Sequence, residues 1–392
     1  MPAPQALDPQ DLLHRLTDAT PAMVTDLERL VRAESPSLDG DALSTCRTVL
    51  AEIGTRLLGT APTILPNDPG NGRPGGLLWQ LGPADTQPVL LLGHFDTVFP
   101  KGTLKHRPFL VEGTRATGPG VFDMKAGLIQ GLYAVAQLRE LTGQDPAVAF
   151  LATADEEIGS PAGGRVVTQW ARQCRAALVL EGAADGGGLK HARKGWSFYD
   201  IRVKGIAAHA GLEPDKGCNA LSDLAKIIVA LESLAAQDDR ITLTPTLASA
   251  GTTQNTVPDR AQVTVDVRVP DIQTQQEIDT ALHRVVAETA RLPFEITGGP
   301  NRPPLEQARA ADLLVTARTC LDELGLPWPG SAAVGGISDG NLCAAAGTPT
   351  LDGLGAVGGG PHADHEWADV THMPQRAALV ALMMERLGAA AR

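Results

Sequence analysis

Short apolar runs alternate with longer stretches of helical spacing along the first half of the chain. Runs near 75–81, 89–92, 147–152 and 176–180 have the length and composition of buried strands. Apolar residues three or four positions apart cover 12–32, 42–58 and an amphipathic segment that begins near Asp123. Between these segments, 103–120 reads as irregular chain. The alternation predicts an α/β fold, a mixed and mostly parallel sheet flanked by helices.

The pattern changes after the three glycines at 186–188. Residues 197–203, 242–249, 262–269 and 294–296 read as strands, and 218–234 and 278–290 as helices. This β-α-β-β-α-β order is typical of a split βαβ, ferredoxin-like module. We therefore expect an inserted α+β domain over 193–302, between the two parts, 1–192 and 303–392, of a larger domain.

Composition and charge exclude several classes of protein. Hydrophobic residues make up 43% and charged residues 20%, so a large core is feasible. The net charge of −12 argues against a nucleic-acid partner, and no apolar run reaches the roughly 20 residues of a membrane helix. Because the first 32 residues lack a signal-peptide core, we expect a cytoplasmic location. The five cysteines, an odd number without CxxC spacing, are expected to be free thiols.

Three of the apolar runs end in residues that can bind a metal or transfer a proton. His94 and Asp96 follow the second run, Asp155–Glu157 the third and Glu181 the fourth. Open α/β sheets bind ligands beyond the carboxyl ends of their strands. His94 and Asp96 alone would also fit a structural pair, and three adjacent acids repel unless water or a cation compensates them. The repetition at three strand ends favours a metal site.

Two further candidates complete a ligand set. Asp123 precedes a helix, where a simple N-cap is the alternative, and His362 lies in a glycine-rich loop. The five candidate ligands, two imidazoles and three carboxylates, are too many for one tetrahedral ion and suit two divalent ions that share a carboxylate. They are His94, Asp123, Glu157, Glu181 and His362. Glu156 is then a candidate general base, and Asp96 is placed to orient His94.

The motifs taken together resemble the M20 metallopeptidase family, close to its glutamate carboxypeptidase (carboxypeptidase G2-like) branch. The similarity covers essentially the whole chain. The motifs that carry it are His94-Phe95-Asp96-Thr97-Val98, Gly118-Pro119-Gly120, Asp123-Met124-Lys125-Ala126-Gly127, Asp155-Glu156-Glu157-Ile158-Gly159-Ser160, Glu181-Gly182, His209-Ala210-Gly211 and His362 followed by Glu366. The resemblance implies a zinc-peptidase-like catalytic domain with an inserted lid or dimerisation domain.

The resemblance also implies a role for each site residue. Glu156 would be the base with Asp96 as its helper. His94 and Glu181 would hold one ion, Glu157 and His362 the other, with Asp123 between them and zinc as the expected metal. His209 would stabilise the oxyanion with Asn255 nearby, and Arg268 would bind the substrate's C-terminal carboxylate. A strained peptide bond, cis in form, is expected between Asp123 and Met124.

Several alternatives stay open. His365 lies in the same loop as His362, and only the spacing to Glu366 prefers His362. Arg268 could be a solvated charge on a strand and His209 an ordinary loop residue. His209, if functional, could act within its own chain or across a dimer.

The expected function is a two-metal hydrolase that cleaves a C-terminal amide of a small peptide or N-acyl amino acid and releases glutamate or a related residue. An N-acyl-amino-acid deacylase or dipeptidase of the same family is the alternative among enzymes. A metal-free binding protein on the same scaffold is the alternative outside them. We expect a homodimer through the inserted domain, without a nucleic-acid or membrane partner.

Overall fold

The computed structural model describes residues 7–235 and 238–389, so 1–6 of the N-terminal segment, 236–237 and 390–392 lie outside the described residues. Internal contacts divide the chain into two units. The larger unit comprises Met1–Ala192, Gln307–Val334 and Ser338–Arg392, and the smaller unit comprises Arg193–Glu306 and Gly335–Ile337. A role of the smaller unit as a lid or dimerisation domain stays a prediction.

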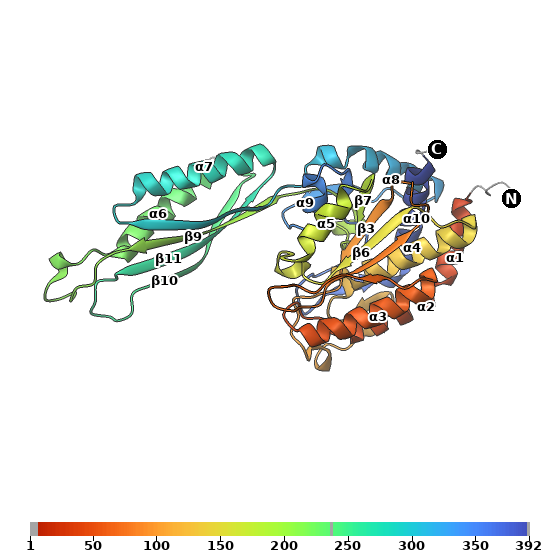
Figure 1. Cartoon of the computed structure of the whole chain (residues 1–392), viewed down its shortest axis with the longest axis horizontal. Helices are drawn as coiled ribbons and strands as arrows, with labels where there is room; N and C mark the ends of the chain where they lie inside the picture. Colours follow the sequence, from red (N-terminus) through yellow and green to blue (C-terminus); the bar gives the residue numbers. More distant parts are fainter. Residues whose placement is uncertain (1–6, 236–237, 390–392) are drawn as a thin grey trace. The chain divides into compact units, whose positions relative to one another are not determined.

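A six-stranded sheet forms the centre of the larger unit (Figure 1). In spatial order its strands are β1 (Thr63–Ile64), β2 (Leu77–Leu81), β6 (Val148–Thr153), β3 (Val89–His94), β7 (Ala176–Val179) and β14 (Thr350–Leu351). The last four run parallel, whereas β1 and β2 pair antiparallel at one edge. Strands β3 and β6 are buried at every position, which explains their continuous apolar sequences. The predicted mixed, mostly parallel sheet is confirmed.

Helices cover both faces of this sheet. They are α1 (Pro9–Asp18), α2 (Thr20–Arg32), α3 (Gly40–Leu58), α4 (Ala126–Thr142), α5 (Gly163–Ala171), α8 (Ala311–Glu323), α9 (Gly340–Ala345) and α10 (Met373–Ala389). Leu91 and Phe150 face a core shared with α1–α4, α8 and α10. Their neighbours Leu92 and Leu151 face a smaller cluster with α5 and α9. The predicted α/β class is therefore confirmed.

The first helical segment differs from its prediction. The helical spacing over 12–32 belongs to two helices, α1 and α2, which meet at Ala19. Pro21 lies in the first turn of α2, and a proline is tolerated there but not inside a continuous helix. Leu16 and Met23, on either side of the break, are both fully buried. The apolar spacing continues across the break because the buried residues of both helices pack into the same core.

Helix α4 was predicted to be amphipathic and to begin near Asp123, and both expectations are wrong. The helix begins at Ala126 and is buried at every position from there to Val135. A Cβ on Gly127 would lie 2.0 Å from the carbonyl oxygen of Leu180, so the helix is packed directly on the strand layer. Helices α1, α2, α3 and α10 contact it as well. Because its neighbours bury this part of α4 on all sides, it has no polar face.

The sequence pattern did not predict several short strands. The segment predicted to be irregular, 103–120, contains β4 (Leu110–Glu112) and β5 (Arg115–Thr117). They join β16 (Trp367–Asp369) and β15 (Gly358–Gly359) in a second sheet, ordered β15-β16-β5-β4. A further pair joins β8 (Leu189–Arg193) to β13 (Ser331–Val334). Strands of two to five residues carry too little periodicity, and their partners lie far away in the sequence.

The smaller unit has the predicted β-α-β-β-α-β order. Its elements are β9 (Gly195–Lys204), α6 (Ala220–Ala235), β10 (Thr242–Ala250), β11 (Arg260–Val269), α7 (Ile272–Thr289) and β12 (Phe294–Arg302). The antiparallel sheet is ordered β10-β11-β9-β12 (Figure 1). The alternating valines of β11, including Val263 and Val265, pack in one core with residues of α6 and α7. The predicted ferredoxin-like module is confirmed, with β12 longer than expected.

Two predictions about chain chemistry can be compared with the structure. The cysteines Cys46, Cys174, Cys218, Cys320 and Cys343 are free thiols, as predicted. Among the described residues, no helix has the length and apolar character needed to cross a bilayer.

Candidate metal centre and active site

The sheet of the larger unit brings three candidate ligands to one edge. His94 is the last residue of β3, Glu157 follows β6 and Glu181 follows β7. Strands β6, β3 and β7 are parallel neighbours, so their carboxyl ends meet at the same edge. The residues that follow three separate apolar runs in the sequence therefore lie close together in the structure.

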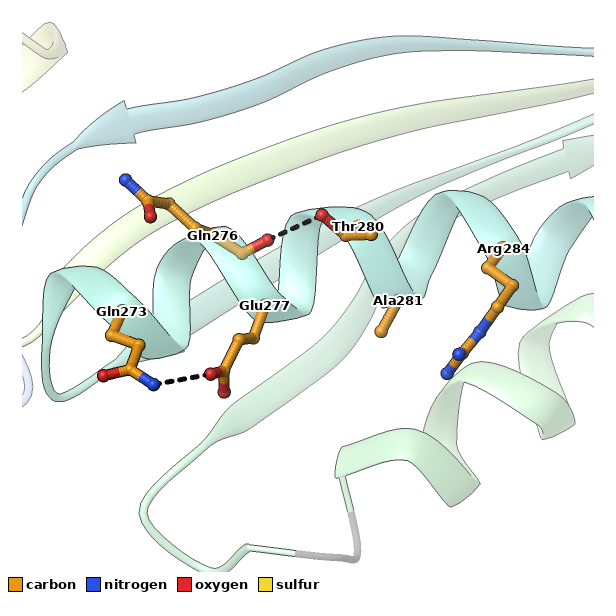
Figure 2. A pocket seen from close by; sticks show the side chains of 6 residues that line it. All are labelled: Gln273, Gln276, Glu277, Thr280, Ala281 and Arg284. Carbon is orange, nitrogen blue, oxygen red and sulfur yellow. Dashed lines mark hydrogen bonds between the residues drawn. The ribbon is translucent and has the colours of Figure 1, made fainter.

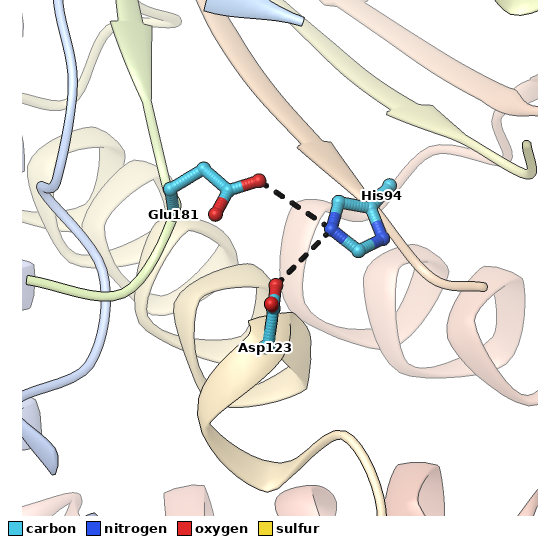
Figure 3. Close-up of side chains that lie close together, drawn as sticks. All are labelled: His94, Asp123 and Glu181. Atoms are coloured by element: carbon cyan, nitrogen blue, oxygen red, sulfur yellow. Dashed lines mark ion pairs between the residues drawn. The ribbon is translucent and has the colours of Figure 1, made fainter. Parts of the chain in front are cut away.

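His94, Asp123 and Glu181 form the first ligand group (Figure 3). Nε2 of His94 lies 3.3 Å from Oδ1 of Asp123 and 3.4 Å from Oε1 of Glu181. His94 is only 1% exposed. Its Nε2 and the Oδ1 of Asp123 are buried without a hydrogen-bond partner among the described residues. Buried polar atoms of this kind need a partner, and a metal ion supplies one.

Asp123, Glu157 and His362 form the second group. Nε2 of His362 lies 3.3 Å from Oδ2 of Asp123 and 3.0 Å from Oε2 of Glu157. Asp123 therefore turns one carboxylate oxygen to each histidine. The donors are imidazole nitrogens and carboxylate oxygens, which fit two divalent ions that share Asp123.

The peptide bond between Asp123 and Met124 is cis, as expected. It lies in an irregular turn, Val121–Lys125, where Asp123 and Met124 depart from helical geometry. The turn precedes α4, so Asp123 is not the N-cap of that helix.

Contacts with Asp96 on the Nδ1 side of His94 leave Nε2 to face the other ligands of its group. Its Nδ1 lies 3.0 Å from the backbone oxygen of Asp96 and 3.3 Å from Asp96 Oδ1. With the proton on Nδ1, the lone pair of Nε2 faces Asp123 and Glu181. Burial lowers the pKa of His94, but the nearby carboxylates of Asp123, Asp96 and Glu181 outweigh burial and raise it well above its ordinary value. The same carboxylates would stabilise a metal cation in place of the proton.

Opposing effects also set the charges of the second group. Burial raises the pKa of Asp123, but His362 and His94 outweigh it, so the pKa is strongly lowered. Hydrogen bonds to Asp123 and Glu157 raise the pKa of His362 to about 10. Burial raises the pKa of Glu157. The raised pKa values of both histidines and the lowered pKa of Asp123 have one cause, the short distances between the imidazole nitrogens and the carboxylate oxygens.

Asp96 connects the first strand end to the pair of adjacent glutamates. It is fully buried, and its two oxygens accept the backbone N–H groups of Glu156 and Glu157, each at 3.2 Å. Ser37 Oγ donates to Asp96 Oδ2 at 2.8 Å. Asp96 therefore contacts both His94 and the turn that carries Glu156, and its role in orienting His94 stays a prediction. Ser37 gave no sequence signal because it lies in a short loop remote from every motif.

The structure distinguishes the two loop histidines by position. His362 belongs to the second ligand group, whereas His365 belongs to neither group formed by the described residues. The backbone of His362 has a φ of 63°, in the left-handed region. Only the spacing to Glu366 pointed to His362 in the sequence.

The three predicted substrate-binding residues lie in the smaller unit. Nδ1 of His209 accepts the backbone N–H groups of Gly211 and Leu212 at 3.2 and 3.1 Å, so its ring proton belongs on Nε2. The backbone oxygen of Asn255 accepts the N–H of Ala210 at 2.8 Å, which places Asn255 beside the His209 loop.

Arg268 is paired within the smaller unit. Its Nε and Nη2 donate to the two carboxylate oxygens of Asp266 at 2.8 and 3.0 Å. Trp196 Nε1 also donates to Asp266, at 2.7 Å. The residues that the sequence assigned to substrate binding thus fall into one unit, and the ligand groups into the other.

A family model decides the class of protein. The model of peptidase family M20/M25/M40 matches residues 90–386, which include every ligand of both groups. The chain belongs to this family. It is therefore a hydrolase of the peptidase or amidohydrolase type.

Individual relatives agree with the M20 assignment. The chain is similar to Carboxypeptidase G2 of Pseudomonas sp. (strain RS-16), 27% identical over 96% of this chain and 92% of that protein. It is 28% identical to a succinyl-diaminopimelate desuccinylase of Methylobacterium sp. (strain 4-46), over 68% of this chain and 70% of that one. Aminopeptidase PepT from Bacillus cereus ATCC 10987 has a similar fold, with a TM-score of 0.77, 21% identity and coverage of 94% and 98%.

The smaller unit has a surface depression that contains none of the candidate ligands. It is lined by Gln273, Gln276, Glu277, Thr280, Ala281 and Arg284, all from α7 (Figure 2). The Gln273 amide donates to Glu277 at 2.8 Å, and Thr280 bonds the backbone of Gln276. These two hydrogen bonds run along the helix itself, and the lining residues include no histidine, cysteine or pair of carboxylates, so the depression does not resemble a catalytic site.

The raised pKa of His362 predicts a pH-dependent stability in chelator-treated protein. Its pKa of about 10 exceeds the ordinary 6.5, so the stabilisation is fully present below pH 6.5 and is lost as the pH rises toward 10. The melting-temperature advantage of the wild type over His362→Gln should shrink across that range. Thermal melts with chelator check this, and His365→Gln should match the wild type. A difference that stays constant or grows with pH would contradict the prediction.

Proposed function

We propose that the chain is a two-metal hydrolase, with zinc as the working ion, that cleaves the C-terminal amide bond of a small peptide or N-acyl amino acid. The observation that carries the proposal is the position of Asp123, whose two oxygens face two different ligand groups. One group would be His94 and Glu181, and the other Glu157 and His362. A carboxylate shared in this way suits paired divalent ions.

The chemistry divides between the ions and the chain. When bound, the ions would polarise the scissile carbonyl and lower the pKa of the attacking water. The Glu156 carboxylate would take a proton from that water and pass it to the leaving nitrogen as the C–N bond breaks. Asp96 would keep the base in place through its hydrogen bond to the Glu156 backbone.

Residues of the smaller unit would recognise the substrate. His209 would donate from Nε2 to the developing oxyanion, with Asn255 beside it. Its Nδ1 is already an acceptor for two backbone N–H groups, which supports this tautomer. Arg268 would bind the terminal carboxylate of the substrate.

Two substrate classes remain to be compared. Similarity to Carboxypeptidase G2 along nearly the whole chain supports a carboxypeptidase. The motif resemblance to the glutamate carboxypeptidase branch makes glutamate the first candidate for the released residue. Similarity to desuccinylases over 68% of the chain supports the second candidate, removal of an acyl group from an N-acyl amino acid or cleavage of a dipeptide.

The test is hydrolysis of a substrate panel by protein with a measured metal content. The panel contains folate-like glutamates, N-acyl amino acids and dipeptides, each paired with its C-terminal amide. The highest kcat/KM on an acylated glutamate supports the first candidate, and a preference for N-succinyl or dipeptide substrates supports the second. Protein that binds two zinc ions and hydrolyses no member of the panel would contradict the proposal. Protein that binds no metal would favour the metal-free alternative.

Glu156→Gln should keep both metal ions and lose nearly all turnover. The substitution is nearly isosteric and removes only the proton acceptor, and general bases contribute roughly 10²–10⁴-fold. Metal analysis and kcat on the best substrate check this. Glu157→Gln, at the adjacent position, is the matched control and should lose metal as well as activity. A kcat for Glu156→Gln within a few-fold of wild type, with metal content unchanged, rules out the assigned base.

Arg268→Ala should weaken catalysis only for substrates with a free C-terminal carboxylate. Hydrogen bonds to charged groups contribute about 1.5–3 kcal/mol, so kcat/KM should fall on the order of 10–100-fold. Amide-capped substrates should show little change. Arg202→Ala is the control, because Arg202 lies on neighbouring β9 with a side chain 53% exposed. Equal losses on the free acid and its amide would show that Arg268 has no role in carboxylate binding.

We also propose that the smaller unit forms a homodimer. Strand β10 is an edge of its sheet, and Leu247 on that strand is 72% exposed. Leu221 and Val229 on α6 are 47% and 62% exposed. An open edge beside exposed apolar residues needs a partner, and two-fold dimers are the commonest oligomers.

Complementation tests whether His209 acts across the dimer. His209→Ala alone should lower kcat on the order of 10²–10³-fold, the effect of an oxyanion donor. A mixed dimer with Glu156→Gln has one site that takes Glu156 from one chain and His209 from the other. Activity should return after subunit exchange, measured together with sedimentation to show that mixed dimers form. Mixed dimers that form and stay inactive would place His209 in the site of its own chain.

A further inference from the structure

A buried carboxylate that belongs to neither ligand group holds the turn that carries Asp123. Glu366 is fully buried. Its Oε2 accepts the backbone N–H of Gly120 at 2.8 Å, and its Oε1 accepts those of Phe122 and Asp123 at 3.0 and 2.9 Å. A buried charge is tolerated only where hydrogen bonds compensate it. Three backbone donors and the guanidinium of Arg107, with Nη2 3.7 Å from Oε2, compensate the charge, and one of the donors belongs to the shared ligand itself.

Regular secondary structure does not fix this turn. Gly120 has a φ of 73°, and Asp123 and Met124 have non-helical dihedral angles, so regular secondary structure does not set the direction of Asp123. The backbone of Lys125 donates to Gly120 O at 2.9 Å and closes the turn. Glu366 therefore supplies much of what orients Asp123.

Lys125 anchors the opposite end of the same turn. Its buried Nζ donates to the backbone oxygens of Leu30 and Ala33 at 3.1 and 2.9 Å, at the end of α2. A cation at a helix C-terminus is stabilised by the carbonyl groups there. Between Glu366 and Lys125, the turn is fixed on both sides.

Glu366 also lies four residues after His362, in the segment between β15 and β16. Its backbone N–H donates to Ala363 O at 3.1 Å, which closes the loop. One side chain thus ties the segment with His362 to the turn with Asp123. The distance that results, 3.3 Å between His362 Nε2 and Asp123 Oδ2, is the one on which the second ligand group depends.

We propose that Glu366 is a positioning residue for the metal pair, acting through Asp123 and His362 without touching an ion. The inference rests on the two-metal site proposed above. Outer partners of metal ligands typically contribute 10–100-fold in metal affinity. Glu366 differs from most such partners because it holds the backbone of one ligand and the loop of another.

Glu366→Gln tests this with minimal change of shape. Whichever way the new amide turns, its NH₂ faces at least one backbone N–H, so one hydrogen bond becomes a clash of donors. We expect metal affinity, measured by competition with a chelator, to fall 10–100-fold and the absorption spectrum of the cobalt-loaded protein to change. Asp364→Asn removes the same charge from the same loop. The Asp364 side chain is 96% exposed, so its contact with Arg107, 3.7 Å long, should contribute little. This control should match the wild type in both measurements.

The outcomes separate this inference from the proposed function. Wild-type protein that fails to bind two ions overturns both. Wild-type protein that binds two ions, with Glu366→Gln equal to it in affinity and cobalt spectrum, overturns only the role of Glu366. Should the variant not fold, amide hydrogen exchange in metal-free wild type decides. The amides of Gly120, Phe122 and Asp123 should exchange slowly, and exchange at the rate of exposed turn amides would contradict the inference.

Discussion

The carboxylate of Asp123, placed between two imidazoles, is the interaction on which the rest of the site depends. One of its oxygens lies 3.3 Å from His94 Nε2 and the other 3.3 Å from His362 Nε2. Each histidine is in turn close to a second carboxylate, Glu181 or Glu157. Three acids converge in a buried region, and cations must compensate their repulsion, whether as protonated imidazoles or as metal ions. The parallel sheet makes this convergence possible, because its strands end at one edge.

The three adjacent acids after β6, Asp155, Glu156 and Glu157, lie in different hydrogen-bonding environments. Asp155 turns inward and accepts the backbone N–H groups of Ala162 and Gly163, at 2.8 and 3.0 Å through Oδ2. It is thus a structural residue at the start of α5. Glu156 and Glu157 have their backbone N–H groups bound by Asp96. Backbone donors thus compensate the carboxylates of Asp155 and Asp96, two of the acids that lie close together at this edge of the sheet.

Sequence reasoning succeeded where the signal was local. The apolar runs of β3, β6 and β7 and the alternating valines of β11 identified both sheets, and the ends of the first three gave His94, Glu157 and Glu181. It failed where distant contacts decide. Strand β5 exists because it pairs with β16, far along the chain. Helix α4 lost its expected polar face because both of its sides are covered. Periodicity reports how one segment is buried, not which partners bury it.

Buried charges set the deeper limit on prediction from sequence. Lys125 is 1% exposed and Glu366 is fully buried, yet a hydrophobicity pattern assigns both to the surface. Their hydrogen-bond partners are backbone groups, the carbonyls at the end of α2 and the N–H groups of one turn, with Arg107 3.7 Å from Glu366. Backbone groups are present at every position, so no residue type marks them in the sequence. Ligand residues can be recognised by their chemistry, whereas the groups that aim them become visible only when the backbone is placed. The geometry of a metal site therefore depends on backbone contacts that its sequence motifs do not reveal.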